Sequence, residues 1–216
     1  MIFYRFVAAC VAGYLLGAIP FSLVIGKTFF KIDLRRFGSG SLGTTNTLRV
    51  LGGRAALAVL LLDALKGTCA VWVAWLLVPT SVFGASTHSW ALVVGTFAAI
   101  FGHAFSPYID FKGGKGVATT AGAVLAMQPI VACILIVLFI IIVYSTRYVS
   151  VASMVVATLY PIMVLVFYRE LPFILFAFIA AILIIWLHRA NIVRLIAGEE
   201  SKISIKHRGS QSRGDH

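Results

Sequence analysis

Charged residues are scarce in this chain, and acidic ones are the scarcest. Of its 216 residues, 12% are charged and seven are Asp or Glu, whereas 61% are hydrophobic and the mean hydropathy is +1.01. Soluble globular domains carry about 25% charged residues. The composition therefore excludes a soluble enzyme and predicts an all-α integral membrane protein, since apolar segments of about 20 residues cross a bilayer as helices.

Cysteine is also rare, and its placement argues against a metal or redox site. Cys10, Cys69 and Cys133 each lie alone in an apolar run, without the paired spacing of metal-binding or redox cysteines. We expect three small packing residues in the protein interior. We also expect neither a metal nor a cofactor.

Polar breaks divide the apolar sequence into seven transmembrane helices. The fourth is short, because Gln128 and Pro129 end it after Met127. We expect one domain at 1–201, followed by a polar, disordered tail at 202–216. The seven predicted spans are 4–25, 55–78, 88–110, 117–127, 129–145, 150–168 and 171–188.

The positions of Lys and Arg predict how these spans are oriented. With the polar segments alternating between sides, 15 of the 18 basic residues fall on one side, only Arg5 and Arg169 fall on the other, and Lys66 lies within a span. The positive-inside rule makes the basic side cytoplasmic, so we expect the amino terminus outside and the carboxyl terminus in the cytoplasm. The net charge of +11 thus has a simpler source than nucleic-acid binding.

Residues 113–116 (G-G-K-G) form a polar segment directly before an apolar helix. Glycines let backbone N–H groups converge, the helix start adds a partial positive charge, and Lys112 and Lys115 add full charges, which is how a phosphate is held. The alternative is a tight turn whose lysines only mark the cytoplasmic side. A Walker A loop is excluded by the spacing, so ATP hydrolysis is disfavoured.

A second polar segment, at 38–49 (G-S-G-S-L-G-T-T-N-T-L-R), offers hydroxyl and amide groups together with Arg49. Such groups suit a small phosphorylated polyol, because a guanidinium binds phosphate through two parallel hydrogen bonds. Further along, His188 and Asn191 share one helical face at the exit of the last span, and Arg147 ends the fifth. Each of these has a structural alternative: a helix-capping loop, a structural His, and an anchoring Arg.

Ionisable residues inside the spans are few. Asp63 and Lys66 are one helical turn apart, so we expect them to neutralise each other. His103 and Asp110 lead into Lys112 and could orient the G-G-K-G segment.

These motifs, in this order, resemble the bacterial acyl-phosphate:glycerol-3-phosphate acyltransferase family known as PlsY. The resemblance extends over nearly the whole chain. Its motifs are Y-L-L-G-A-I-P-F-S at 14–22, the segment 38–49, L-D-A-L-K-G at 62–67, G-H at 102–103, F-K-G-G-K-G-V-A-T at 111–119, R-Y-V-S at 147–150, H-R-A-N-I at 188–192 and G-E-E at 198–200.

The resemblance implies transfer of a fatty acyl group from acyl phosphate to the sn-1 hydroxyl of glycerol 3-phosphate, giving lysophosphatidic acid and phosphate. It implies a monomer in the bacterial cytoplasmic (inner) membrane, with its active site at the cytoplasmic face. Glycerol 3-phosphate would be held by Arg49, Lys112, Arg147 and His188. Ser39 and Asn191 would position the reacting groups as catalytic residues. The donor phosphate would be held by Gly113, Gly114, Lys115, Gly116, Val117, Ala118 and Thr119.

The expected chemistry needs little beyond positioning and charge, because acyl phosphate carries a good leaving group. The H-x-x-x-x-D motif of other glycerophosphate acyltransferases is absent from the sequence. The rival reading is a membrane transporter of a phosphorylated metabolite or lipid, which would require a polar path across the membrane. An integral phosphatase is disfavoured for lack of a phosphate-attacking constellation.

Overall fold

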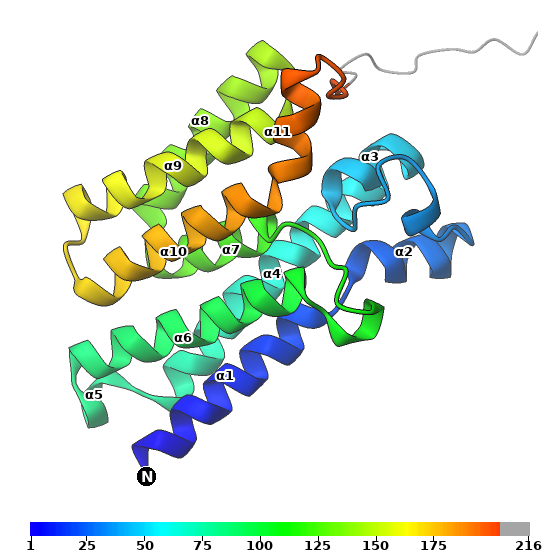
Figure 1. The fold of residues 1–216 in the computed structure, drawn as a ribbon. Coiled ribbons are helices and arrows are strands. Elements are labelled where there is room, and N and C mark those ends of the chain that lie inside the picture. Colours follow the sequence, from blue (N-terminus) through cyan, green and yellow to red (C-terminus); the bar gives the residue numbers. More distant parts are fainter. Residues whose placement is uncertain (204–216) are drawn as a thin grey trace, which may run out of the picture.

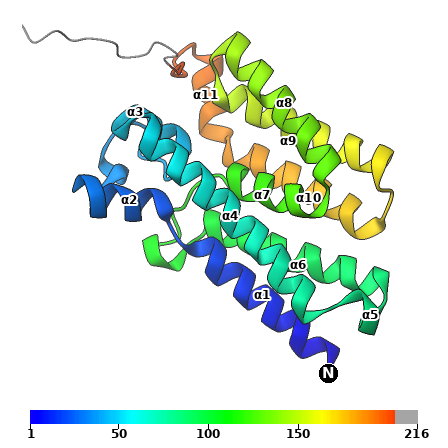
Figure 2. The same ribbon diagram turned by 180° about the vertical axis from the view of Figure 1, so that it is seen from behind.

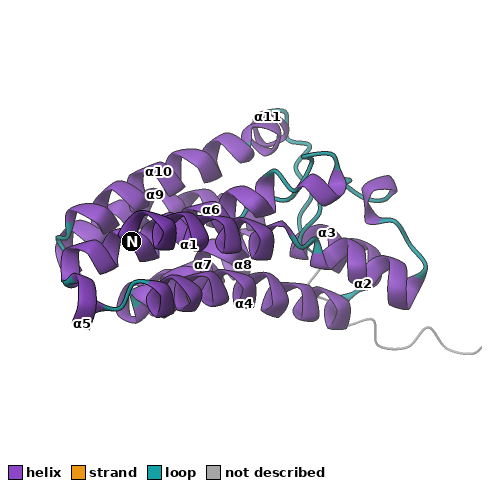
Figure 3. Cartoon of the chain, turned by 90° about the horizontal axis from the view of Figure 1, so that it is seen from below, coloured by secondary structure: helices purple, strands orange, loops and turns teal. Residues whose placement is uncertain are grey.

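The computed structural model describes residues 1–203, and within them it contains helices and loops but no strand (Figures 1 and 3). The fold class is therefore all-α, as predicted. The elements are α1 (Ile2–Ala18), α2 (Phe21–Phe30), η1 (Leu34–Arg36), α3 (Thr44–Leu51), α4 (Gly53–Leu77), α5 (Thr80–Phe83), α6 (Ala85–Ala104), η2 (Pro107–Ile109), α7 (Val117–Met127), α8 (Pro129–Thr146), α9 (Val149–Phe167), α10 (Leu171–Leu187) and α11 (Arg189–Ile196).

Close helix contacts depend on glycine at two interfaces. A Cβ on Gly13 or Gly17 of α1 would clash with backbone atoms of Gly95 or Ala99 in α6. Gly67 of α4 lies just as close to α7. Small residues at such crossings let helix backbones approach in a membrane, where van der Waals packing drives association.

Helices α8, α9 and α10 pack together on one side of the bundle, and α10 lies in front of α7 in the view of Figure 1. Their interface with α6 and α7 contains the main hydrophobic cluster, including Phe176, Val131 and Val164. Tyr160 donates a buried hydrogen bond of 2.8 Å to Gln128, which ties α9 to the junction of α7 and α8. Many large apolar side chains on the outer helix faces stay exposed, as expected for a surface in contact with lipid.

Five helical segments are long and apolar enough to cross a membrane, and α10 with α11 makes a sixth if that pair, bent by 54°, is one span. The remaining predicted span, α7, has the expected bounds but only 11 residues, about 16 Å of helix against about 30 Å of hydrocarbon. The count of seven membrane crossings stays a prediction.

Three expectations about these segments are corrected. The span predicted at 4–25 lies within Ile2–Phe30, which is long and apolar enough to cross a membrane. It is not one continuous helix, because it breaks at Ile19 and Pro20, where proline lacks the N–H that a continuous helix requires. Thr44–Leu51, expected as part of a polar loop, is the helix α3. Of the three cysteines, Cys10 and Cys133 are exposed and are not interior packing residues.

The polar segments meet at one end of the bundle. Helices α2, α3 and α11 lie together at this end, and the amino terminus lies at the opposite end (Figures 1 and 2). We call this the α3–α11 end. The predicted tail at 202–216 lies outside the described residues except for Lys202 and Ile203, and Ile203 donates its N–H to the carbonyl of Arg147 at 2.9 Å.

Candidate active site

A chain of hydrogen bonds links the G-G-K-G segment to α11. The Lys115 ammonium donates to Asn191 Oδ1, and Asn191 Nδ2 donates to Glu200 Oε1 at 2.6 Å. Lys115 and Asn191 are 76 positions apart in the sequence, so only the fold brings them together. Two of the residues singled out by their motifs thus share one site.

Glu200 organises this site, and sequence reasoning did not assign it a role. Its carboxylate is buried and also accepts hydrogen bonds from Ser150 at 2.8 Å and from Arg194 Nε at 2.8 Å. Burial alone would raise the pKa of Glu200, but the hydrogen bonds from Asn191, Ser150 and Arg194 lower it below its ordinary value. One feature of the sequence could have pointed to Glu200: it is an acidic residue in a chain with few of them. It also lies two residues after Gly198, where the chain turns with a φ of +71°.

Lys115 lies in an excess of positive charge. Burial lowers its pKa to about 8, and although Glu200 opposes this shift, Arg194 and Arg49 add to it. Three cationic groups, those of Lys115, Arg194 and Arg49, thus lie near one carboxylate, that of Glu200. Such a cluster favours binding of an anion, because a bound anion would stabilise the protonated lysine.

The backbone beside Lys115 supplies further donors. The N–H groups of Gly113 and Gly114 are already bonded, to the carbonyls of Ala104 and His103 at 3.0 and 3.1 Å. Within residues 1–203, however, the N–H groups at the start of α7 have no protein acceptor. These unbonded donors are those of Lys115, Gly116, Val117, Ala118 and Thr119. The start of a helix with free N–H groups attracts anions, and the buried Thr119 hydroxyl is also without a partner among the described residues.

The polar side chains at 38–49 mainly hold their own backbone in place. Asn46 is buried, accepts the Ser39 N–H at 2.9 Å, and donates to the carbonyls of Leu34 and Phe37. Thr47 donates to Gly43 at 2.9 Å. This network fixes the segment that precedes α3, and α3 in turn carries Arg49.

Arg49 reaches the C-terminal segment, where its guanidinium donates to the Ser201 carbonyl at 2.9 Å. Arg147 ends α8 with a φ of +64°, and its carbonyl accepts the Ile203 N–H. Residues 200–203 therefore connect Asn191, Arg49 and the turn at Arg147.

His188 lies at the bend between α10 and α11 with 2% of its surface exposed. Its Nδ1 is 2.8 Å from the Ile184 carbonyl, so a neutral ring donates from Nδ1 and keeps Nε2 as an acceptor. Ser39 and Lys112 are exposed, and neither side chain forms a hydrogen bond or an ion pair within residues 1–203. The fold thus joins Lys115, Asn191 and Arg49 through direct or bridged contacts, whereas Ser39, Lys112 and the Arg147 guanidinium remain outside that network.

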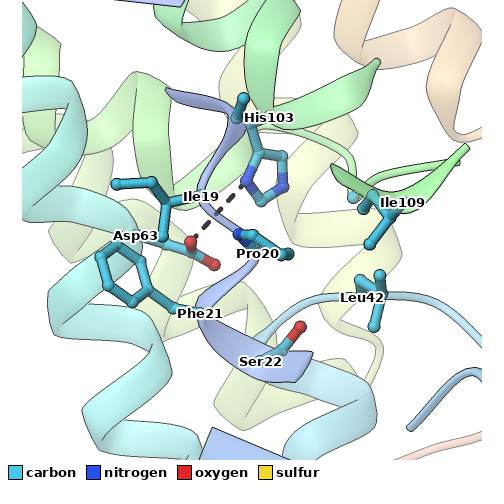
Figure 4. Close-up of a pocket in the computed structure, with 10 residues that line it drawn as sticks. Ile19, Pro20, Phe21, Ser22, Leu42, Asp63, His103 and Ile109 are labelled. Carbon is cyan, nitrogen blue, oxygen red and sulfur yellow. Dashed lines mark ion pairs between the residues drawn. The ribbon is translucent and has the colours of Figure 1, made fainter. Parts of the chain in front are cut away.

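A second polar cluster lies deeper in the bundle. Lys66 Nζ is 2.8 Å from Asp63 Oδ1, which confirms the expected neutralisation. His103 Nδ1 is 3.7 Å from the same Asp63 oxygen (Figure 4). Asp63 and His103 border a cavity of about 10 Å³.

An apolar groove of about 630 Å³ runs between α1, α6 and α10. Its lining includes Leu15, Phe97 and Phe176. A row of aromatic rings continues from the groove toward the α3–α11 end. The ring centroids of Phe101 and Phe105 are 4.6 Å apart, and those of Phe105 and Trp186 are 6.2 Å apart. Trp186 is two residues before His188, so the groove leads toward the polar site. Within residues 1–203, no group of three or more His, Cys, Asp or Glu side chains is arranged to hold a metal ion.

Fold and site together define a helical integral membrane protein with a cationic centre and free N–H groups at one end and an apolar groove leading to it. Residues 7–198 match the sequence model of the family described as glycerol-3-phosphate acyltransferase. The chain therefore belongs to the glycerol-3-phosphate acyltransferase family.

Individual relatives agree with this assignment. The chain is 42% identical over 196 residues to glycerol-3-phosphate acyltransferase 2 of Moorella thermoacetica, covering 90% of this chain and 96% of that one. It is 44% identical over 195 residues to the enzyme of Staphylococcus aureus (strain Newman), with coverages of 88% and 94%. It also resembles the crystal structure of PlsY, an integral membrane glycerol 3-phosphate acyltransferase, in its glycerol 3-phosphate form, with a TM-score of 0.84, 36% identity and coverages of 92% and 96%. The lysophosphatidic acid form of PlsY gives a TM-score of 0.81 at 35% identity, with coverages of 92% and 95%.

Proposed function

We propose that this chain transfers a fatty acyl group from acyl phosphate to the sn-1 hydroxyl of glycerol 3-phosphate. The bond between the acyl carbon and the phosphate oxygen breaks, an ester to the sn-1 oxygen forms, and the hydroxyl proton leaves with inorganic phosphate. The observation that carries the proposal is the position of Lys115, which lies among free N–H groups at the start of α7 and is linked to Asn191 of α11. The names of the relatives, and the two PlsY structures with acceptor and product, support the same reaction.

The donor phosphate binds at the start of α7, where Lys115 and the N–H groups of residues 115–119 converge. The N–H groups of Gly113 and Gly114 are occupied by carbonyls of α6, so these two glycines shape the donor site and do not bind the phosphate through their N–H groups. The acyl chain occupies the groove between α1, α6 and α10, because an apolar chain is stabilised by burial there.

The acceptor binds on the α3 and α11 side of the donor phosphate. Arg49, Lys112, Arg147 and His188 hold its phosphate and hydroxyl groups, while Ser39 and Asn191 position the reacting atoms. Arg49 and Arg147 are already linked through residues 200–203, which supports a common binding region. Ser39 and Lys112 would have to turn toward the bound substrates from their exposed positions.

No side chain in this site is required as a strong base. The transition state develops charge on the phosphate that leaves and on the carbonyl oxygen, and a preorganised cluster of cations and N–H groups stabilises that charge. Holding donor and acceptor together supplies the rest, since two reactants fixed side by side react as one molecule. A phosphate oxygen accepts the hydroxyl proton.

The protein works as a monomer in the cytoplasmic membrane of a bacterium, with seven helices in the membrane and its site at the cytoplasmic face. The distribution of basic residues supports this orientation. The decisive experiment measures phosphate release from a synthetic acyl phosphate by the purified protein in detergent, with and without glycerol 3-phosphate, and identifies the lipid product by mass spectrometry. Acceptor-dependent release with lysophosphatidic acid as product supports acyl transfer. Binding of acyl phosphate without turnover would favour the transporter instead.

A further inference from the structure

The first two glycines of the G-G-K-G segment pack against His103, one against its carbonyl and the other against both its carbonyl and its ring. Gly114 donates its N–H to the His103 carbonyl at 3.1 Å, and a Cβ on Gly114 would clash with His103 Nε2. A Cβ on Gly113 would clash with the same His103 carbonyl. The ring and the backbone of one residue therefore fix the position of both glycines.

The other side of the His103 ring faces a buried ion pair. Asp63 Oδ1 is 3.7 Å from His103 Nδ1 and 2.8 Å from Lys66 Nζ, and the side chains of Asp63 and Lys66 are at most 4% exposed. Lys66 also donates to the Ile19 carbonyl at 3.0 Å, at the break between α1 and α2. Figure 4 shows His103 and Asp63 facing each other beside Ile19 and Pro20. The break in the first span is thus connected through Lys66, Asp63 and His103 to Gly114.

This cluster has no room for a substrate. The adjoining cavity of about 10 Å³ holds about one water molecule. Any effect of His103 on the reaction must therefore pass through the backbone that it contacts. That backbone continues directly into the free N–H groups of residues 115–119.

We propose that His103 is a positioning residue for the donor phosphate. Its ring, which lies against the Asp63–Lys66 ion pair, contacts Gly114 and fixes its position. The position of Gly114 in turn sets the direction of the N–H groups at the start of α7. This inference rests on the proposed function, in which those N–H groups hold the phosphate of acyl phosphate. A purely structural role would affect folding without distinguishing donor from acceptor. The positioning role predicts a selective effect on the donor.

The test measures kcat, both KM values and thermal stability for His103→Ala, His103→Gln and Asp63→Asn. The KM for acyl phosphate should rise about tenfold in His103→Ala, the loss expected for one misdirected hydrogen bond, while the KM for glycerol 3-phosphate stays within about twofold. His103→Gln should recover most of the donor affinity, because its amide reaches close to the position of Nε2. Asp63→Asn keeps the shape of the side chain but removes the charge beside His103 Nδ1. It should raise the KM for acyl phosphate less than His103→Ala does, and it should leave the KM for glycerol 3-phosphate unchanged.

The matched control is Tyr160→Phe. It removes a buried hydrogen bond of 2.8 Å to Gln128, between α9 and the junction of α7 and α8 and outside both polar clusters. It should lower thermal stability and leave both KM values unchanged. If His103→Ala does not fold, Asp63→Asn still decides the question, since it keeps a side chain of the same size and a rise confined to the donor KM is expected for it.

Lys115→Ala separates this inference from the function on which it rests. If Lys115→Ala raises the KM for acyl phosphate and the His103 and Asp63 variants change only stability, the positioning role is overturned and the donor site stands. Equal changes in both KM values would also overturn it. If Lys115→Ala leaves the donor KM unchanged, the donor site and the positioning role both fail.

Discussion

The charge of Lys115 depends strongly on its surroundings. Burial lowers its pKa to about 8, so the ammonium that binds an anion is lost as the pH rises through about 8. The kcat/KM for acyl phosphate, which reports the free enzyme, should therefore fall above about pH 8. Lys115→Arg keeps its charge to much higher pH and should remove this alkaline limb. Identical alkaline limbs in both proteins would mean that another group causes the fall.

The stability of the protein should change in the opposite direction over the same range. The pKa of Lys115 in the fold is below its ordinary value of 10.5, so the unfolded chain binds the proton more tightly between about pH 8 and 10.5. The free energy of unfolding then rises with pH in this window as far as Lys115 contributes to it. Thermal melting at each pH, run alongside the kinetics, will show that the loss of activity is not caused by unfolding.

Arg49 tests the assignment of the acceptor. In Arg49→Lys the positive charge stays but the paired donors of the guanidinium are lost, so the KM for glycerol 3-phosphate should rise about tenfold and the KM for acyl phosphate should change little. Steady-state kinetics with each substrate varied in turn gives both constants. Arg36→Lys, an exposed change in η1, is the control and should alter neither. A rise confined to acyl phosphate would mean that the donor and acceptor sites have been exchanged.

At the scale of elements, the groove between α1, α6 and α10 should determine which acyl chains are accepted. Ala98 of α6 lines this groove, so Ala98→Phe fills part of it and should disfavour long-chain acyl phosphates. We expect the ratio of kcat/KM for long over short donors to fall by about tenfold, the effect of a few lost methylene contacts. The matched control is Ile182→Phe on α10, which is 67% exposed and does not line the groove. An unchanged ratio in Ala98→Phe would place the acyl chain elsewhere.

The sequence predicted some helices better than others for physical reasons. The bounds of α7 were predicted correctly, because Gly116 before it and Gln128 and Pro129 after it mark both ends. Helix α3 was not foreseen, because its threonines and asparagine are weak helix formers. It forms because Val50 and Leu51 pack against a small cluster that includes Leu23, Leu34 and Leu42, and such tertiary contacts have no local signature.

The site was predictable in its parts but not in its assembly. Lys115 and Asn191 were identified separately by their motifs, whereas their direct contact depends on how α7 and α11 pack. Glu200 joins them because the chain reverses at Gly198, where Glu199 and Glu200 donate their N–H groups to the Arg194 carbonyl. A reversal of this kind brings distant groups together without any periodic pattern that the sequence alone would reveal.

For the whole molecule, the orientation in the membrane follows from its charge asymmetry. Among the described residues, 12 of the basic side chains belong to segments at the α3–α11 end. Arg5 lies at the other end, where its guanidinium donates to the Leu77 carbonyl at 2.7 Å and faces the Phe83 ring. Basic residues are retained on the cytoplasmic side during insertion. The α3–α11 end and the carboxyl terminus should therefore face the cytoplasm.

Two reporter fusions test this orientation. A reporter that is active only in the cytoplasm should be active when fused after His216, and inactive when fused after Gly84, between α5 and α6 at the opposite end. A reporter active only outside the membrane should give the reverse pattern. Activity of the same reporter at both positions would contradict a bundle that spans the membrane between these ends. A complete reversal would keep the bundle but place the site outside, away from any cytoplasmic source of glycerol 3-phosphate, and so would count against the proposed reaction as well.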